Sequence, residues 1–325
     1  MINFNVYRAR YICVAPMMNW TDRHCRYFHR QLSRYVYLYT EMVTTNALLY
    51  GDTTRHLSFM PQEAPIALQI GGSEPDHLAR CAKLAERWGY DEINLNCGCP
   101  SKRVQRGSFG ACLMKEAQLV ADCVKAMRDA VAIPVTIKHR IGIDTINDYE
   151  FVRDFIGTVS QGGSRVFIVH ARNAILKGLS PKKNREIPPL KYSYVYQLKR
   201  DFSELEIIIN GNVKTLDEAH EHLRYVDGVM IGRGAYQNPF LLADVDKRFY
   251  DPSALVRTRD EVEQAMIEYI LAQQACGTYI GAITRHMLGL YRNQPGARDW
   301  RRILSDQQKL ATGDPRIIEE AQRYC

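Results

Sequence analysis

The sequence lacks an apolar run long enough to cross a membrane. No stretch reaches about 18 consecutive apolar residues, and residues 1–8 contain no apolar signal core. We therefore expect a cytoplasmic protein that neither spans a membrane nor is secreted. With 325 residues, 46% hydrophobic and 24% charged, the chain has the composition of a folded globular protein with room for a large domain and a smaller one.

The sequence also lacks two common site patterns. Its nine cysteines are odd in number and scattered, which predicts free thiols. Cys97 and Cys99 are close in sequence, but no second pair follows at the spacing of metal ligands, so we expect no metal. The first apolar segment, 12–16, runs into Met17 and Met18 without a glycine, which argues against a Rossmann dinucleotide site.

Eight apolar runs bounded by turn residues predict β-strands. They cover residues 12–16, 35–40, 66–71, 91–96, 134–140, 165–170, 206–210 and 227–231. Amphipathic segments such as 74–88 and 116–131 separate them and predict helices. This alternation favours a (β/α)8 TIM barrel, with a doubly wound open sheet as the alternative.

The pattern changes after Asp251-Pro252-Ser253. Helical periodicity then covers residues 259–275, 280–291 and 299–310, with no further strand. We therefore predict two domains, a catalytic barrel over 1–245 and a small helical bundle over 251–325.

A reactive thiol is predicted at the end of the fourth strand. There Pro100 cannot extend a ladder, and we expect Gly98 to permit a turn that aims Cys99 into a cavity, with the Asn96 amide donating and accepting hydrogen bonds. A thiol stays largely protonated at neutral pH, so Cys99 can give up a proton as well as attack. The alternative is that Cys97 and Cys99 are both simply buried.

Polar groups stand at the other strand ends, where barrels place their chemistry. Asn210-Gly211-Asn212 and Gly232-Arg233-Gly234 follow the last two strands and suit a phosphate, although Asn-Gly is equally typical of a tight turn. With Gln69, Lys138 and His170 they predict flavin mononucleotide (FMN) across the barrel mouth, where the Lys138 ammonium would stabilise the negative charge of the reduced ring.

Positive charge is concentrated in three segments of this chain, whose net charge is +7. Between Arg172 and Arg200 the only acid is Glu186; Lys102, Arg103 and Arg106 lie directly after Cys99; and residues 285–302 are rich in arginine. Three basic clusters beside predicted site loops suggest a polyanionic partner, while the alternative is that each is a solvated face.

Several motifs together resemble one family. They are Ala15-Pro16-Met17-Met18-Asn19-Trp20-Thr21-Asp22, Asn94-Leu95-Asn96-Cys97-Gly98-Cys99-Pro100-Ser101, Ile209-Asn210-Gly211-Asn212 and Ile231-Gly232-Arg233-Gly234. Across nearly the whole chain the sequence is similar to the tRNA-dihydrouridine synthases. Gly178-Leu179-Ser180-Pro181-Lys182-Lys183-Asn184-Arg185, Thr284-Arg285-His286-Met287-Leu288-Gly289-Leu290 and Pro295-Gly296-Ala297-Arg298-Asp299-Trp300-Arg301-Arg302 resemble its bacterial A-type branch.

The resemblance implies a flavoenzyme that reduces the C5–C6 double bond of uridine around position 20 of the tRNA D-loop, with NADPH as reductant. The flavin hydride would go to C6, and Cys99, with Asn96 nearby, would protonate C5. The flavin contacts that carry over are Pro16, Met17, Met18, Gln69, Lys138, His170, Asn210, Gly211, Asn212, Gly232 and Arg233. Cys97 would pack or touch the substrate. No obligate protein partner is inferred.

We expect Lys182, Arg185, Arg298 and Arg301 to contact tRNA, with Lys102, Arg103 and Arg106 as second choices. Trp300 is set aside because a tryptophan at helical spacing is usually core. Two other functions remain open: an FMN barrel acting on a free pyrimidine, as dihydroorotate dehydrogenases do, and a non-catalytic RNA-binding barrel. The helical tail and basic loops argue against the first, and the full set of strand-end ligands argues against the second.

Overall fold

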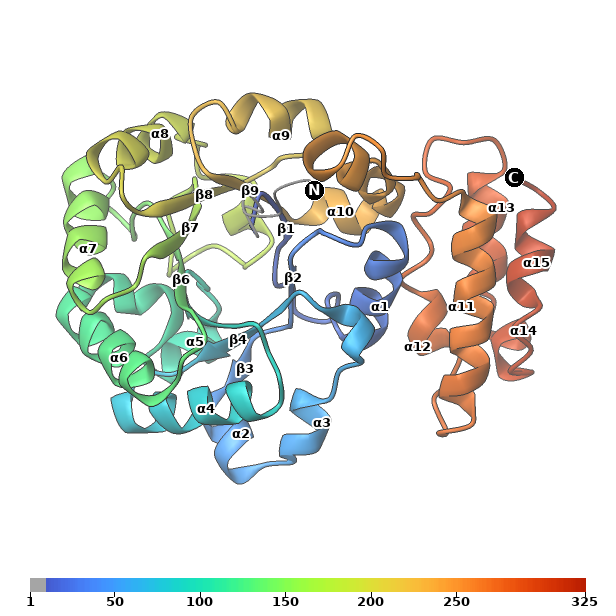
Figure 1. Ribbon diagram of the computed structural model, residues 1–325, viewed down its shortest axis with the longest axis horizontal. Coiled ribbons are helices and arrows are strands. Elements are labelled where there is room, and N and C mark those ends of the chain that lie inside the picture. The colour runs from blue at the N-terminus through green and yellow to red at the C-terminus, as the bar shows by residue number, and fades with distance from the viewer. Residues whose placement is uncertain (1–9) are drawn as a thin grey trace.

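The computed structural model describes residues 10–325 and contains a closed parallel barrel (Figure 1). The segment 1–8, in which no signal core was found, lies outside the described residues, as does the start of the predicted domain 1–245. The strands are β1 (Ile12–Val14), β2 (Leu38–Tyr39), β3 (Val43–Thr44), β4 (Ile66–Gly71), β5 (Glu92–Cys97), β6 (Val135–Arg140), β7 (Val166–His170), β8 (Glu206–Asn210) and β9 (Gly228–Ile231).

The strand order around the barrel is β1-β9-β8-β7-β6-β5-β4-β2, and β3 pairs with the C-terminal end of β4. A parallel bridge between Cys13 and Tyr37 joins the first strand to the segment before β2 and closes the ring. The predicted (β/α)8 barrel is confirmed, and the open sheet is wrong. The second strand is shorter than predicted, and β3 was not predicted because its two residues carry no apolar run.

Helices surround the barrel (Figure 1). The longer ones are α1 (Arg23–Leu32), α4 (Pro75–Arg87), α6 (Ala117–Ala130), α7 (Tyr149–Gln161), α8 (Tyr192–Asp201) and α9 (Leu216–His222). Short α-helices are α2 (Thr45–Tyr50), α3 (Thr53–Leu57), α5 (Lys102–Arg106) and α10 (Arg233–Gln237). Short 3₁₀-helices are η1 (Pro61–Glu63), η2 (Gly110–Lys115), η3 (Lys183–Arg185) and η4 (Pro239–Asp244). A short π-helix, η5 (Asp246–Tyr250), follows η4.

Two hydrophobic clusters divide the interior. The large one fills the space between the strands and the outer helices, and the small one lies inside the barrel. The small cluster consists of Cys13, Ala15, Tyr37, Tyr39, Ala67, Val166, Ile168, Ile208 and Met230. Most of these residues come from β7, β8, β9, β1 and β2 and the segment just before β2, whereas β5 and β6 contribute none. The barrel interior is therefore apolar on one side only.

Five helices follow the barrel: α11 (Arg259–Gln274), α12 (Gly281–Thr284), α13 (Ala297–Leu304), α14 (Gln307–Ala311) and α15 (Ile317–Gln322). The predicted helix 280–291 is wrong beyond its first turn, because residues 285–296 form turns. The predicted helix 299–310 is interrupted at Asp306, whose side chain caps α14. Trp300 is fully buried and donates from Nε1 to the Met287 carbonyl at 2.9 Å.

The helical bundle lies against α1 and the loops after β1 and β9 (Figure 1). Tyr269 of α11 stacks on Tyr27 of α1 with ring centroids 3.9 Å apart, and His286 contacts the Asp22 carboxylate. The division into domains 1–245 and 251–325 stays a prediction. Within residues 10–325, no helix combines the length and apolar character needed to cross a membrane.

Candidate active site

The Cys99 loop is held by one asparagine. Oδ1 of Asn96 accepts from the backbone N–H groups of Gly98 at 3.0 Å and Cys99 at 2.9 Å, and its Nδ2 donates to Oε1 of Gln69 at 2.9 Å. The prediction that this amide both donates and accepts is confirmed. Arg140 donates from Nε to the Gly98 carbonyl at 2.9 Å, so the loop is fixed from two sides. Cys99 itself is half-buried.

The expected need for glycine at position 98 is wrong. Gly98 is not among the residues with positive φ, and an added Cβ would only reach ordinary contact with the His139 backbone at 3.4 Å. The turn is made by the Asn96 side chain rather than by unusual backbone angles.

Cys97 and Cys99 have different surroundings. Cys97 is 0% exposed and belongs to the cluster between the strands and the outer helices. Burial raises the pKa of its thiol far above the ordinary value. Cys97 therefore packs in this cluster. The prediction that it contacts RNA is wrong, because its side chain is not exposed to solvent.

Two basic side chains lie inside the mouth beyond this loop. Nζ of Lys138 donates to Oδ1 of Asn210 at 3.0 Å, and burial together with the Arg140 guanidinium lowers the Lys138 pKa to about 7. Burial and the neighbouring Arg140 and Lys138 also hold the pKa of His170 well below its ordinary value, so its imidazole is neutral. His170 Nδ1 is buried without a hydrogen-bond partner.

The loops after β8 and β9 pack against each other. Asn210 donates from Nδ2 to the Met230 carbonyl at 2.7 Å, Gly211 has φ +137° and Asn212 has φ +58°. A Cβ at Gly234 would lie 2.8 Å from the Val213 carbonyl, so this close approach requires glycine. The two loops predicted to bind phosphate are thus neighbours.

Arg233 has a partner within the chain. Its Nη1 donates to Oε1 of Glu186 at 2.6 Å, in an ion pair that is partly exposed to solvent. Glu186 is the single acid of the basic segment 172–200. The forked contact of Arg233 with a phosphate stays a prediction. To form it, the guanidinium must either bind the phosphate and Glu186 together or break its ion pair with Glu186.

The sequence reasoning did not assign roles to Arg140 and Arg172, which are both buried at the mouth. Arg140 donates from Nη1 to the carbonyls of Asn173 at 3.0 Å and Asn184 at 3.1 Å, and burial lowers its pKa to about 10. Arg172 donates to the carbonyls of Glu186 and Pro188. The period-two alternation of Thr136, Lys138 and Arg140 along β6 was the available signal that Arg140 faces the barrel interior.

The loop after β1 carries the remaining predicted flavin contacts. Pro16 and Met17 are half-buried, Met18 is 55% exposed, and the Met17 N–H donates to Oγ1 of Thr21 at 2.9 Å. Gly232 lies nearby, because its added Cβ would be 3.9 Å from the Met17 sulfur. The loops after β1 and β9 are therefore adjacent.

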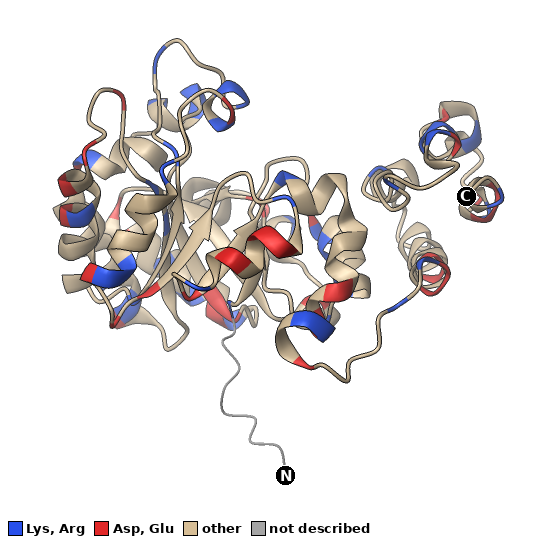
Figure 2. Cartoon of the chain, turned by 90° about the horizontal axis from the view of Figure 1, so that it is seen from above, with Lys and Arg blue, Asp and Glu red and all other residues tan. Residues whose placement is uncertain are grey.

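Two of the basic clusters meet beside Cys99. Nε2 of Gln105, in α5, donates to the carbonyls of Pro100 at 2.9 Å and Leu176 at 3.0 Å and so ties α5 to the segment after β7. The exposed cations on α5 and on the segment 171–190 are Lys102, Arg103, Arg106, Lys177, Lys182, Lys183 and Arg185. Elsewhere, basic and acidic residues are both found along the outer helices (Figure 2).

Arg298 and Arg301 lie on α13 of the helical bundle and are exposed. Neither guanidinium forms a hydrogen bond or ion pair with another described residue, whereas Arg302 on the same helix pairs with Asp299 at 3.0 Å. Both side chains are thus available to an external anion.

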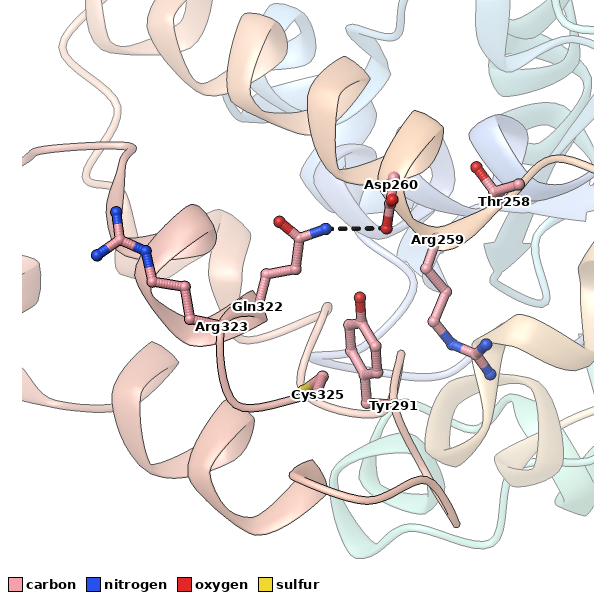
Figure 3. Close-up of a pocket in the computed structure, with 7 residues that line it drawn as sticks. All are labelled: Thr258, Arg259, Asp260, Tyr291, Gln322, Arg323 and Cys325. Atoms are coloured by element: carbon pink, nitrogen blue, oxygen red, sulfur yellow. Dashed lines mark hydrogen bonds between the residues drawn. The ribbon is translucent and has the colours of Figure 1, made fainter.

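Two surface cavities are lined by residues other than Cys99. One of about 460 Å³ in the helical bundle is bounded by Thr258, Arg259, Asp260, Tyr291, Gln322, Arg323 and Cys325 (Figure 3). Another, of about 820 Å³, lies along α8 and α9, and Asn212 alone of the predicted flavin residues lines it. Among residues 10–325 no cluster of three or more His, Cys, Asp or Glu side chains could hold a metal ion.

The residues at the mouth fit FMN. Lys138, Arg140, Arg172 and Arg233 are basic, and the Glu186 carboxylate pairs with Arg233. Nδ1 of His170 is buried without a hydrogen-bond partner and needs a polar group opposite it. A flavin offers ring carbonyls and nitrogens to such groups and carries a phosphate.

A closed (β/α)8 barrel with a thiol and basic groups at its strand ends is the arrangement typical of barrel enzymes. The sequence model of the family described as dihydrouridine synthase (Dus) matches residues 13–323. The chain therefore belongs to the dihydrouridine synthase family.

Its curated relatives are similar over almost their entire length. The tRNA-dihydrouridine(20/20a) synthase of Yersinia pestis is 57% identical over 316 residues, which cover 97% of this chain and 91% of the relative. The proteins of the same name from Vibrio parahaemolyticus and Escherichia coli K12 are 57% and 60% identical, covering 95% of this chain in both cases and 95% and 89% of the relatives.

Proposed function

We propose that this protein reduces the C5–C6 double bond of uridine at positions 20 and 20a of the tRNA D-loop, with FMN as cofactor and NADPH as reductant. The observation that carries the proposal is the Cys99 thiol, fixed at the barrel mouth by Asn96 and Arg140 in a member of the dihydrouridine synthase family. The curated relatives carry the same two positions in their names.

The proposed reaction adds one hydride and one proton. When bound, FMN would provide the hydride for C6, with NADPH as the source of its electrons. Cys99 donates its proton to C5 as the electron pair of the double bond moves toward that carbon. Asn96 and Arg140 act through Cys99, because both bind the backbone that positions it.

Eleven residues are proposed to hold FMN. They are Pro16, Met17, Met18, Gln69, Lys138, His170, Asn210, Gly211, Asn212, Gly232 and Arg233. The neighbouring loops of β8 and β9 support a phosphate site there, and Lys138 would carry its positive charge beside the pyrimidine edge of the ring.

We further propose that the helical domain, 251–325, and the basic loops bind the tRNA in the cytoplasm without an obligate protein partner. The target base must leave its stack to reach Cys99, at a cost of a few kcal/mol that phosphate contacts and stacking offset. Lys182, Arg185, Arg298 and Arg301 are the proposed contacts, then Lys102, Arg103 and Arg106. Asn96 would lie beside the base.

The direct test uses purified protein, NADPH and unmodified tRNA transcripts. We expect a yellow protein that releases FMN on denaturation and forms dihydrouridine at positions 20 and 20a; a transcript with cytidine at both positions should remain unmodified. A colourless protein that binds tRNA would support the non-catalytic barrel. Turnover of free uracil or orotate without tRNA would support the small-molecule reductase.

Replacing Arg298 and Arg301 together by alanine should weaken tRNA binding about tenfold and lower the salt dependence of binding by roughly one to two counterions. Both guanidiniums are exposed and carry no internal salt bridge, so the protein should fold normally. Filter binding at several salt concentrations measures both quantities. Arg80→Ala and Arg87→Ala together remove the same charge from the exposed side of α4, and an equal loss in that double variant would refute a specific role for α13.

A further inference from the structure

One side of the barrel interior is unusually polar. Barrel interiors are normally filled by branched apolar side chains. Here the interior positions of β5 are Glu92, Asn94 and Asn96, and Asn94 lies in register with Gln69 on β4 and Thr136 on β6. Glu92, Asn94 and Thr136 are fully buried, although the proposed reaction uses none of them. Because buried polar groups cost free energy unless hydrogen-bonded, this column needs an explanation.

The column is one continuous chain of hydrogen bonds. Nδ2 of Asn96 donates to Oε1 of Gln69 at 2.9 Å, and Nε2 of Gln69 donates to Oδ1 of Asn94 at 2.8 Å. Nδ2 of Asn94 then donates to Oγ1 of Thr136 at 2.8 Å. The Thr136 hydroxyl donates to Glu92 at 2.5 Å. Four consecutive bonds thus connect the Cys99 loop to a carboxylate deep in the barrel.

The two ends of this chain of hydrogen bonds fix the same donor-to-acceptor direction along it. At the bottom, Glu92 also forms an ion pair with Arg10 at 2.5 Å and accepts from the Tyr39 hydroxyl at 2.9 Å, so every side chain that bonds it donates to it. At the top, the backbone N–H groups of Gly98 and Cys99 can only donate. Every amide between them must therefore point its oxygen toward the mouth end and its nitrogen toward Glu92.

We infer that Glu92, Asn94 and Thr136 are positioning residues, which fix the amide orientation of Gln69 and Asn96 and through Asn96 the backbone of Cys99. Without the hydroxyl of Thr136, Asn94 loses the acceptor for its nitrogen, and the three amides can flip together. Flipped, Asn96 would present Nδ2 to the N–H groups of Gly98 and Cys99 and release the loop. The inference rests on the proposed function only in giving Cys99 a catalytic task, since the chain of bonds is a property of the protein alone.

Thr136→Val tests this relay, because it removes the hydroxyl at nearly constant volume. We expect iodoacetamide to alkylate Cys99 of the cofactor-free protein about fivefold faster than in wild type, the equivalent of one lost hydrogen bond. The rate is read by mass spectrometry with the exposed Cys276 as internal reference. FMN binding, followed by fluorescence titration, should weaken by a similar factor, because Gln69 would lose its fixed amide orientation.

Two variants separate positioning from simple destabilisation. Thr136→Ser restores a hydroxyl and should return both values to those of wild type. Thr284→Val removes another fully buried hydroxyl, bonded to the Leu304 carbonyl at 3.3 Å in the helical bundle, and should leave both unchanged. If Thr136→Val and Thr284→Val behave alike, the relay is refuted. The alkylation rate involves neither flavin nor tRNA, so absence of dihydrouridine formation in wild type would refute the proposed function and leave this comparison intact.

Discussion

Cys99→Ala should abolish dihydrouridine formation while leaving FMN bound. Removal of a positioned general acid typically costs about 10²- to 10⁴-fold in rate, and the neighbouring Cys97 cannot substitute, because it is fully buried on the opposite face of β5. The visible spectrum of the purified variant and its FMN affinity should match wild type. Single-turnover reaction of the reduced enzyme with tRNA measures the loss directly.

Cys97→Ala is the matched control, two residues away at the end of β5. It should retain activity and lose about 1 kcal/mol of stability, because it removes one buried sulfur from the packed cluster behind the barrel. Activity lost in Cys97→Ala but kept in Cys99→Ala would show that the acid is assigned to the wrong cysteine.

The fold was predictable because its signals are local. Strands such as β4, β6 and β8 are short apolar runs bounded by turns, and they match the predicted 66–71, 134–140 and 206–210 to within one residue. The same alternation along β5 separates Ile93, Leu95 and Cys97 from Glu92, Asn94 and Asn96. It could have assigned Cys97 to the outer face in advance.

The features that the sequence did not predict correctly depend on contacts between residues distant in sequence. Residues 280–291 have helical periodicity, but Arg285 and His286 bind Asp22, and a Cβ at Gly289 would lie 2.7 Å from the Gln237 carbonyl. These contacts with the barrel hold the segment in turns and override its local preference. Arg140 is similar, because its bonding partners lie in two separate loops, Gly98 after β5 and Asn173 and Asn184 after β7.

Lys138→Met should stabilise the cofactor-free protein and weaken FMN binding. Burial and Arg140 lower the Lys138 pKa to about 7, so folding with a charged Lys138 carries a penalty. Since the folded pKa lies below the unfolded one, the penalty is complete below about pH 7 and declines as pH rises toward the unfolded value of ~10.4. Urea unfolding should therefore show a gain of at least about 1 kcal/mol at pH 6 that shrinks toward pH 9.

The same lysine should make FMN binding depend on pH. An ammonium beside the electron-rich edge of the flavin favours the complex, so binding takes up a proton wherever the free protein has a neutral Lys138. The FMN dissociation constant of wild type should thus rise between about pH 7 and pH 9, by up to tenfold per unit. In Lys138→Met the dissociation constant should be larger and flat across this range. His170 cannot cause the dependence, because burial and its cationic neighbours already keep it neutral there. A variant that keeps the wild-type slope would show that another group titrates. Opposite changes in stability and binding would show that this buried charge is retained for the cofactor, at the expense of the fold.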